Sequence, residues 1–308
     1  MIDRTGLDGE AVVSTDGLSR RFGKVVALDD VTLAVPRGAV FGLVGVNGAG
    51  KTTLLKHVLG LLRAKTGTVR VFGLDPAVDP VGVLSRIGYL GEENDLPGWM
   101  RVHELIAYTS AFYPTWDEAY AQKLRESFQI DPAARVKNLS KGQRARTGLL
   151  LALAHRPDLL VLDEPSSGLD PIARRDILEA VVRTISEEGR TVLFSSHLLH
   201  EVQRVSDHMT MLHEGRVVFS DEFDLIQASY RELTIRFPEP QTQPPPIPDT
   251  LGWRGMGHEW SAVCRGSMDE IRAAVSEIGA RIVEDHTPSL EEIFIAQVAS
   301  ESPVGAEN

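Results

Sequence analysis

Short apolar runs alternate with helical patterns along the first two thirds of the chain. The apolar run at 39–44 leads into a glycine-rich segment, after which apolar positions recur at helical spacing over 54–62. Two further apolar runs, 159–162 and 192–194, flank a helical pattern at 172–188. Strands that alternate with helices predict an α/β fold built on a parallel sheet.

The N-terminal part of the chain carries weaker strand patterns. Residues 1–14 are expected to form a flexible leader. Apolar residues at 25–28 and 31–35 predict strand structure on either side of a turn at Asp29-Asp30. Residues 68–72 predict one more short strand.

Three helical patterns without intervening strands occupy the middle of the chain. They cover 102–113, 117–128 and 140–155, and prolines separate them. We therefore expect a helical subdomain at about 98–156, inserted into a core domain that spans 15–226.

The pattern changes after a predicted hairpin over 209–219, which turns at Glu214-Gly215. Residues 230–299 predict a small α+β accessory domain, and 300–308 a frayed tail. Within that domain, strands are expected at 233–237, 260–264 and 281–284, and a helix at 268–278. Six prolines at 238–248 predict a loop or polyproline II structure.

Composition narrows the class of protein. Of the 308 residues, 43% are hydrophobic and 24% are charged, as in an ordinary globular protein. The formal net charge of −11 argues against broad electrostatic binding of nucleic acid, so no nucleic-acid partner is expected. A single cysteine, Cys264, excludes an internal disulfide framework.

No segment predicts a membrane span or a secretory signal. The longest strongly apolar helical run, 149–154, is far shorter than the ~20 residues that a span needs. The N-terminus carries Asp3, Asp8 and Glu10 and lacks an apolar core. If the protein works at a membrane, we expect another chain to supply the membrane part.

A glycine-rich segment with a lysine follows the first buried run. It fits the pattern G-x-x-x-x-G-K-[ST] and consists of Gly45, Val46, Asn47, Gly48, Ala49, Gly50, Lys51, Thr52 and Thr53. Glycines let backbone N–H groups surround an oxyanion, and the helix that follows adds its positive end. Lys51 would bind the β- and γ-phosphates, and Thr52 would ligate Mg²⁺. The motif predicts a nucleoside triphosphate site without naming the base; the alternative is a plain glycine-rich turn.

Two acidic residues follow the apolar run at 159–162. Acids at the end of a buried strand are costly unless cations or polarised water accompany them. Consecutive strand residues point in opposite directions, so Asp163 would hold the metal while Glu164 orients or deprotonates the attacking water. The alternative is a pair of solvated acids before a turn at Pro165.

A third motif, LSKGQ at 139–143, opens one of the predicted helices. By itself it is explained by a capping box, in which Ser140 and Gln143 satisfy the first turn. Its position between the phosphate segment and the acidic strand end favours a functional role.

With these motifs in this order, residues 16–220 resemble the nucleotide-binding subunit of ATP-binding-cassette (ABC) transporters. The segment 139–143 resembles the LSGGQ signature of that family, 167–170 its D-loop, and His197 its switch histidine. Phe22 occupies the place of an aromatic residue that stacks on adenine. The resemblance implies a P-loop NTPase core of the ABC type with a mixed sheet, and ATP and Mg²⁺ as ligands.

The resemblance also implies residue roles. Lys51, Glu164 and His197 would be catalytic, with Thr52, Asp163 and Glu92 at the metal. The implied nucleotide contacts outside the phosphate segment are Phe22, Ser140, Gly142, Gln143 and Asp170. Two residues depart from the family pattern: Lys141 replaces a signature glycine, and Glu92 replaces the usual glutamine. Asp170 before Pro171 is also a good helix N-cap.

Two ATP molecules would lie between two such subunits in head-to-tail arrangement, the second being another copy or a paralogous chain. The resemblance implies an integral-membrane permease as partner and a cytoplasmic location on the inner face of the cell membrane. Its single-cassette plan with a C-terminal domain resembles exporters, and import stays open. One alternative is an ABC-type ATPase acting on ribosomes or DNA. Another is a small-molecule kinase or GTPase, which would leave the signature unexplained.

Overall fold

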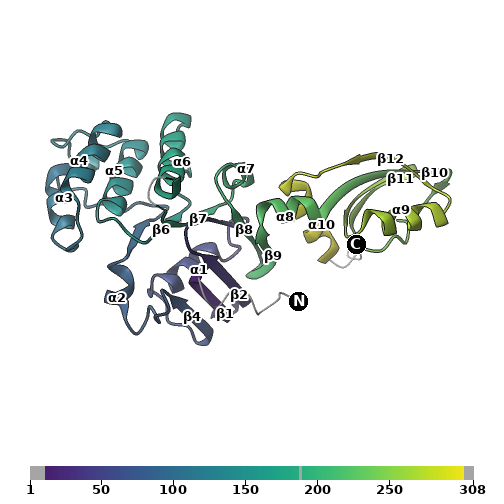
Figure 1. Ribbon diagram of the computed structural model, residues 1–308, viewed down its shortest axis with the longest axis horizontal. Coiled ribbons are helices and arrows are strands. Elements are labelled where there is room, and N and C mark those ends of the chain that lie inside the picture. Colours follow the sequence, from purple (N-terminus) through teal and green to yellow (C-terminus); the bar gives the residue numbers. More distant parts are fainter. Residues whose placement is uncertain (1–10, 187–188, 302–308) are drawn as a thin grey trace. The chain divides into compact units, whose positions relative to one another are not determined.

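The computed structural model describes residues 11–186 and 189–301, which fall into two compact units (Figure 1). The units divide between Ser220 and Asp221, N-terminal to the domain end expected at residue 226. Each unit has its own hydrophobic core. In the described part of the chain, no helix combines the length and the apolar character that crossing a membrane requires.

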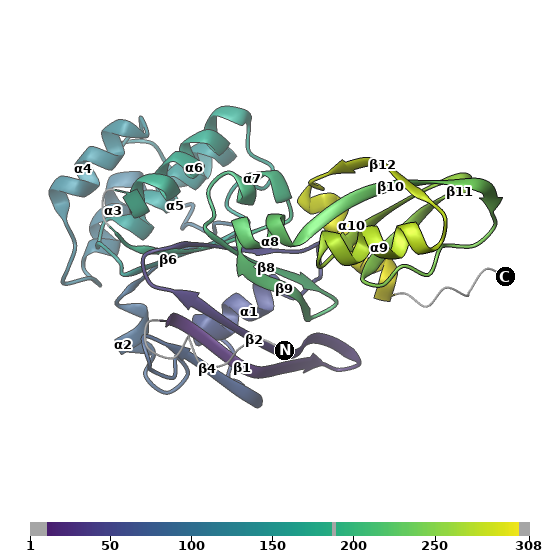
Figure 2. The same ribbon diagram turned by 45° about the vertical axis from the view of Figure 1, so that its right-hand side comes forward.

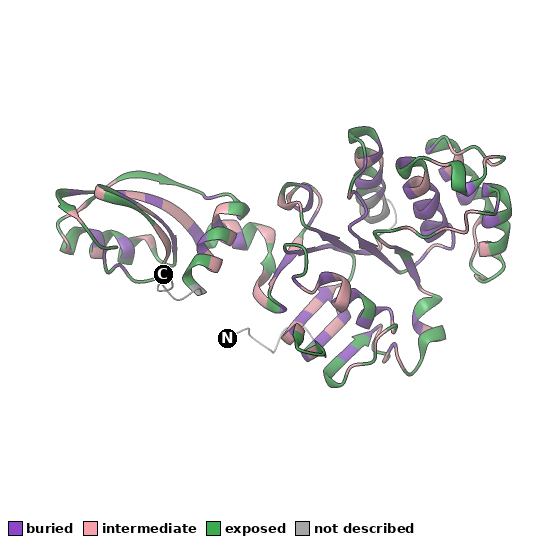
Figure 3. Cartoon of the chain, turned by 180° about the vertical axis from the view of Figure 1, so that it is seen from behind, coloured by how far each residue is buried: buried purple, intermediate pink, exposed green. Residues whose placement is uncertain are grey.

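A six-stranded sheet forms the centre of the first unit. Its strand order is β5 (Ile87–Leu90), β6 (Leu159–Asp163), β7 (Thr191–Ser196), β3 (Val40–Val44), β8 (His208–His213) and β9 (Arg216–Glu222). The pairs from β5 to β8 are parallel, which confirms the predicted parallel sheet. Strands β3, β6 and β7 are buried along their whole length (Figure 3). Because parallel strands end at the same edge, the segments that follow these three strands lie together.

A second, antiparallel sheet has the order β2 (Val25–Pro36), β1 (Ala11–Phe22) and β4 (Thr66–Val71). Strand β1 begins inside the expected leader at 1–14, which corrects that expectation. The side chains of Val12 and Val13 are buried in the core, so these residues belong to the folded unit. Residues 1–10 lie outside the described residues.

The turn expected at Asp29-Asp30 is wrong, because β2 continues through both residues. Leu18 pairs with Val31 and Arg20 with Leu28, so β1 stays beside β2 on both sides of the irregularity. Asp30 has a φ of 56°, and its N–H donates to Ser19 Oγ (2.9 Å). The two aspartates therefore mark a bulge in a strand and not a reversal of the chain.

Helix α1 (Lys51–Val58) lies between the two sheets (Figures 1 and 2). Its buried residues Leu54, Leu55 and Val58 join one core with side chains from both sheets. The helix ends before the predicted limit at 62, and Gly60 follows it with a φ of 69°. This packing holds the N-terminus of α1 against the end of β3.

The three helices predicted for the middle of the chain are present: α3 (Val102–Ser110), α4 (Glu118–Ser127) and α5 (Lys141–Leu153). Helix α6 (Pro171–Ser186) packs against α5. The remaining helical segments of the first unit are α2 (Pro80–Leu84), the 3-10 turn η1 (Val136–Asn138) and α7 (Leu199–Gln203).

The second unit contains a three-stranded antiparallel sheet in the order β11, β10, β12. Its elements are α8 (Phe223–Ser229), β10 (Tyr230–Gln241), β11 (Thr250–Arg265), α9 (Met268–Glu277), β12 (Arg281–His286) and α10 (Leu290–Glu301). Strand β10 includes Pro238 and Pro240, which corrects the start of the loop expected at 238–248, whereas residues 242–248 form neither helix nor strand, as expected. These prolines lie where the register between β10 and β11 is interrupted, after Arg236, so few ladder hydrogen bonds are lost. Helix α10 reaches residue 301, and 302–308 lie outside the described residues.

Candidate functional site

The phosphate segment connects β3 to α1 in a conformation that only glycine permits at two positions. A Cβ on Gly45 would lie 2.4 Å from the carbonyl oxygen of Leu212. A Cβ on Gly50 would lie 2.4 Å from the carbonyl oxygen of Ala27, and Gly50 has a φ of 108°. The loop is thus held between β8 and β2, and the pattern of glycines predicted from the sequence has a steric cause.

Helix α1 begins at Lys51 without a side-chain cap. The first amides of a helix have no acceptor within the helix, and the helix dipole makes this end positive. An uncapped N-terminus after a glycine loop therefore fits an anionic phosphate group.

Lys51 is buried and makes three contacts through Nζ. It donates to the carbonyl oxygens of Gly45 (2.5 Å) and Val46 (3.3 Å), and Nζ lies 3.0 Å from Glu164 Oε1. The side chains of Lys51 and Glu164 are 4% and 6% exposed, so this is a buried ion pair. The pair places the lysine ammonium at the base of the loop, with its charge balanced by Glu164.

Glu164 contacts two functional side chains, one through each carboxylate oxygen. Oε1 faces Lys51, whereas Oε2 lies 2.7 Å from His197 Nδ1 and 3.3 Å from the His197 N–H. A carboxylate only accepts hydrogen bonds, so Nδ1 carries the proton in this contact. The structure therefore brings the three residues predicted as catalytic into one connected group.

Asp163 and Glu164 have different partners, but not through the strand alternation assumed from the sequence, because β6 ends at Asp163. The hydroxyl of Ser195 donates to Asp163 Oδ1 (2.7 Å) and accepts the N–H of Glu164 (3.0 Å). Glu164 has a φ of 49°, in the left-handed region that costs energy for a residue other than glycine. The two carboxylates consequently point to different places, which suits a division of labour between metal binding and chemistry.

Ser195 was not singled out by the sequence analysis, although it supports both acids. The signal that could have found it is a pair of hydroxyl residues, Ser195-Ser196, at the end of a buried strand directly before His197. Buried hydroxyl groups need hydrogen-bond partners, so they mark a polar site inside an apolar strand.

The donors available to a divalent cation are oxygens. Asp163 is buried, and Thr52 is partly exposed in the first turn of α1. A hydroxyl and a carboxylate suit Mg²⁺, which prefers few protein ligands together with substrate phosphates and water. The described residues contain no group of three His, Cys, Asp or Glu side chains that could hold a metal by themselves.

Glu92 leaves the same edge of the sheet as Glu164. Leu90 of β5 pairs with Leu162 of β6, and each glutamate follows its leucine by two positions. The Glu92 side chain is exposed, and no contact described in the structure joins it to Lys51 or Glu164.

Phe22 lies at the turn between β1 and β2, where it pairs with Val25. Its side chain is 46% exposed, and the guanidinium carbon of Arg20 lies 4.7 Å from the ring centre. Strand β2 contacts Gly50 through Ala27, so this hairpin adjoins the phosphate segment. An exposed aromatic ring beside that segment is suited to stacking on a base.

The signature segment begins α5 with the capping box predicted from Ser140 and Gln143. Gln143 N–H donates to Ser140 Oγ (3.2 Å), and Ser140 N–H donates to Gln143 Oε1 (2.9 Å). A Cβ on Gly142 would lie 2.8 Å from the Ala173 Cβ of α6, which explains the glycine. Among the described contacts, none joins this segment to Lys51 of the same chain.

Asp170 caps α6, as its sequence also allows. Its Oδ1 accepts the N–H groups of Ala173 (3.0 Å) and Ile172 (2.9 Å), and these bonds hold the pKa of the carboxyl below its usual value. The side chain of Lys141 reaches the same turn, since its Nζ would lie 2.5 Å from a Cβ on Gly168. The signature and the D-loop of one chain are thus in contact.

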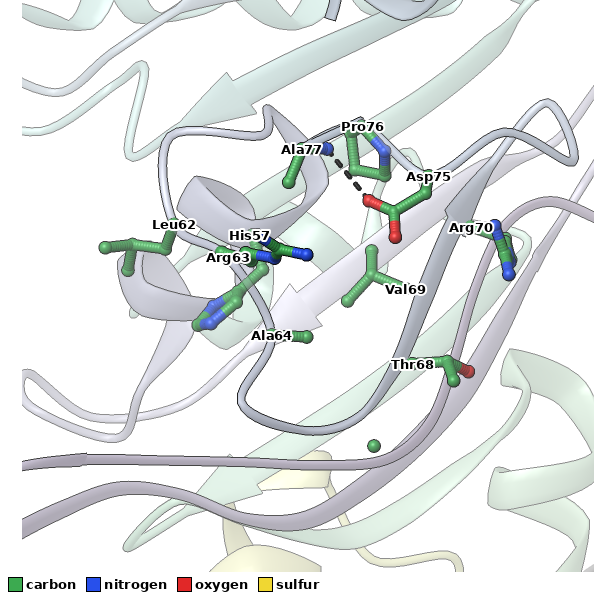
Figure 4. A pocket seen from close by; sticks show the side chains of 11 residues that line it. His57, Leu62, Arg63, Ala64, Thr68, Val69, Arg70, Asp75, Pro76 and Ala77 are labelled. Atoms are coloured by element: carbon green, nitrogen blue, oxygen red, sulfur yellow. Dashed lines mark hydrogen bonds between the residues drawn. The ribbon is translucent and has the colours of Figure 1, made fainter. Parts of the chain in front are cut away.

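A separate small hollow lies at the opposite end of α1 (Figure 4). His57, Arg63 and Arg70 help to line it, together with Asp75, whose Oδ1 accepts the Ala77 N–H (2.9 Å). Its volume of about 140 Å³ is well below the ~300 Å³ of the smallest usual ligand pockets. This hollow is therefore too small for a nucleotide.

The chain is similar to proteins of one family. The family model described as "ABC transporter" matches residues 28–167. The ABC transporter ATP-binding protein NatA of Bacillus subtilis is 34% identical over 236 residues, which are 73% of this chain and 96% of NatA. The ABC transporter ATP-binding protein YhaQ of the same species is 31% identical over 301 residues, 94% of this chain and 99% of YhaQ. A solved structure of an ATP-binding subunit of an ABC transporter is 29% identical, covers 70% of this chain and 92% of its own, and superposes with a TM-score of 0.65.

Proposed function

This chain belongs to the ABC transporter ATP-binding proteins, and on that premise we propose that it hydrolyses ATP to power a separate membrane-embedded permease. The observation that carries the proposal is the connected group of Lys51, Glu164 and His197, which lie in the segments that follow the parallel strands β3, β6 and β7.

Glu164 is the residue that orients the attacking water and accepts its proton. Its Oε1 is paired with Lys51 in the structure, and a bound γ-phosphate would compete for that lysine. Once Lys51 turns to the phosphate, Oε1 is left free to hold water, while Oε2 stays fixed by His197. His197 orients the carboxylate and presents its other ring nitrogen toward the phosphate.

Oxygen ligands beside the loop support Mg²⁺ binding. When bound, the ion supplies positive charge to the phosphate oxygens and so stabilises the developing charge. Thr52 and Asp163 would hold it, and Ser195 keeps the Asp163 carboxylate in position. Glu92, at the same sheet edge, is the further oxygen donor.

A second subunit completes the site. Ser140 and the N-terminus of α5 carry a hydroxyl and the positive end of a helix, yet they make no described contact with Lys51 of their own chain. Two chains arranged head to tail place this end, with Gly142 and Gln143, against the γ-phosphate bound by the other chain. Asp170 lies in the same interface, and Phe22 stacks on the adenine.

Hydrolysis removes the phosphate that joins the two subunits, so ATP binding closes the pair and turnover opens it. A permease that contacts both subunits would follow this motion. The partner is therefore an integral-membrane protein, and this chain works on the inner face of the cell membrane. We favour export, because the plan of one cassette followed by a C-terminal unit resembles exporters whose permease is a separate chain.

The substitution Glu164→Gln tests the proposal. It keeps the shape of the side chain but removes the basic carboxylate. A general base raises the rate of such reactions about 10²- to 10⁴-fold. We expect ATP to bind with at most a small change in affinity, measured by calorimetry, and turnover to fall at least about 100-fold. Glu179→Gln, on the exposed face of α6, is the control and should keep the wild-type rate. Wild-type turnover by Glu164→Gln would exclude Glu164 as the water-activating residue.

A further inference from the structure

Glu201 is a buried carboxylate outside the group that contacts the phosphates. It lies in α7, four residues after His197, and is 1% exposed. A buried carboxylate is costly unless several groups compensate its charge. The partners of Glu201 therefore indicate what the residue does.

Three segments of the first unit meet at this side chain. Oε2 accepts a hydrogen bond from Ser166 Oγ and lies 3.5 Å from Ser196 Oγ, whereas Oε1 lies 3.1 Å from Arg174 Nε. The two serines are buried, with 1% and 0% exposure, and the arginine comes from α6. One carboxylate thus joins the turn after β6, the end of β7 and the helix that follows the D-loop.

These contacts flank the catalytic pair on both sides. Ser166 follows Glu164 by two positions, and Ser196 directly precedes His197. Ser196 Oγ also accepts the Leu198 N–H (3.0 Å), so the turn that carries His197 is fixed locally as well. The Glu164–His197 contact of 2.7 Å consequently depends on two turns that Glu201 holds together.

We propose that Glu201 is a positioning residue, which keeps Glu164 and His197 in hydrogen-bond contact by holding the turns that carry them. The proposal rests on the function proposed above for that pair. Glu164 has a positive φ, and a strained residue keeps such a conformation only when its surroundings determine it. The bond from Ser166 to Glu201 is one such determinant, because it fixes the turn directly after Glu164.

Kinetics of two independent variants test this role. Glu201→Gln removes the charge with little change in shape, and Ser166→Ala removes one hydroxyl without creating a buried charge. We expect each to lower kcat for ATP by about 10- to 100-fold, because a displacement of about 1 Å in a catalytic group can cost that much, while the affinity for ATP stays within about twofold. Ser166→Thr should restore most of the rate, and Glu179→Gln is the control for removing a glutamate charge.

A spectroscopic signature separates positioning from general stability. With histidine labelled by ¹⁵N, the Nδ1–H of His197 that is bonded to Glu164 gives a signal that His197→Asn identifies by its loss. In Ser166→Ala this signal should shift or disappear, although the thermal midpoint stays close to that of the wild type. If Glu201→Gln does not fold, Ser166→Ala alone decides the question.

Two results would overturn the proposal. One is wild-type kcat in a folded Ser166→Ala or Glu201→Gln variant; the other is an unchanged His197 signal in Ser166→Ala. Failure of the proposed function looks different: the wild type itself would not hydrolyse ATP, or Glu164→Gln would be as active as the wild type.

Discussion

Lys51 and Glu164 form an ion pair in a place where one is energetically unattractive. Both side chains are buried, and taking two charges out of water often costs as much as their attraction returns. The pair is better explained by use: a phosphate can replace the carboxylate at Lys51 and set the carboxylate free for chemistry.

Lys51→Ala should therefore weaken ATP binding. A hydrogen bond to a charged group contributes about 1.5–3 kcal/mol, so we expect the dissociation constant to rise by about 10- to 100-fold. Isothermal titration calorimetry measures it, and a thermal melt confirms that the variant folds. Lys56→Ala, an exposed lysine on the same helix, is the matched control. Unchanged affinity in Lys51→Ala would disprove the assignment of the phosphate site.

Two buried histidines predict how the stability of the fold depends on pH. Burial lowers the pKa of His57 and of His155 below the usual 6.5, so the unfolded chain binds protons there before the folded chain does. The free energy of unfolding should hence fall as the pH drops below about 6.5. Backbone N–H groups lower the pKa of the Asp117, Asp170 and Glu292 carboxyls below the usual 3.8 for aspartate and 4.5 for glutamate. These carboxylates therefore stabilise the fold above those values, and their contribution to the free energy of unfolding is lost only as the pH falls below them.

Urea unfolding at pH 7.5, 6.5 and 5.5 measures this dependence. The variant His155→Asn lacks one of the two groups and should lose less stability on acidification than the wild type. If His155→Asn and His57→Asn each show the same pH dependence of stability as the wild type, neither imidazole resists protonation in the folded chain.

Sequence identified four residues of the candidate site by three different signals. Lys51 belongs to the glycine-rich phosphate motif, and Asp163 and Glu164 are acids at the end of a continuous apolar run. His197 was identified only through the resemblance to the ABC family. Glu201 was not found, because it lies in a short helix whose burial no periodicity reveals and two of its partners, Ser166 and Arg174, are distant in the sequence.

At the scale of elements, Ser140 at the start of α5 has two roles, as a helix cap and as a proposed phosphate ligand. Ser140 Oγ caps the helix in this chain and, in the proposed pair of subunits, also faces the phosphate of the other chain. A residue that both caps and binds cannot be interpreted from a single substitution. Variants that separate the cap from the hydroxyl donor are needed.

The variants Ser140→Ala and Ser140→Asp separate the capping role from the hydroxyl donor. Losing an N-cap costs about 0.5–2 kcal/mol, so Ser140→Ala should unfold at lower temperature and turn over more slowly. Aspartate caps as well as serine does but donates no hydrogen bond and adds a negative charge. We expect Ser140→Asp to melt like the wild type and to lose most ATP turnover. Wild-type turnover in Ser140→Asp would leave Ser140 with the capping role alone.

Elements with continuous apolar runs or clear helical spacing were predictable, as β3, β6, β7 and the helices of the insert show. Strand β1 was missed because bulges interrupt its alternation and polar residues occupy half of it. The prolines of β10 led to the prediction of a loop, because proline cannot donate to a regular ladder of hydrogen bonds. The ladder between β10 and β11 is irregular at these prolines, so the strand can contain them.

At the scale of the whole molecule, the proposed function requires that the chain supply only part of each ATP site. The first unit holds the phosphate segment, the acids and the histidine, whereas its signature helix makes no described contact with Lys51. The similarity to YhaQ extends over nearly the entire chain, so the second unit is shared with that relative. A second subunit is therefore the central requirement of the account.

Light scattering of Glu164→Gln tests directly whether ATP joins two subunits. In this variant the phosphate that joins two subunits is bound but not removed, so saturating ATP with Mg²⁺ should double the molecular mass found without nucleotide, and Lys51→Ala should stay monomeric. A monomeric Glu164→Gln chain under these conditions, with ATP binding verified by calorimetry, would contradict the account.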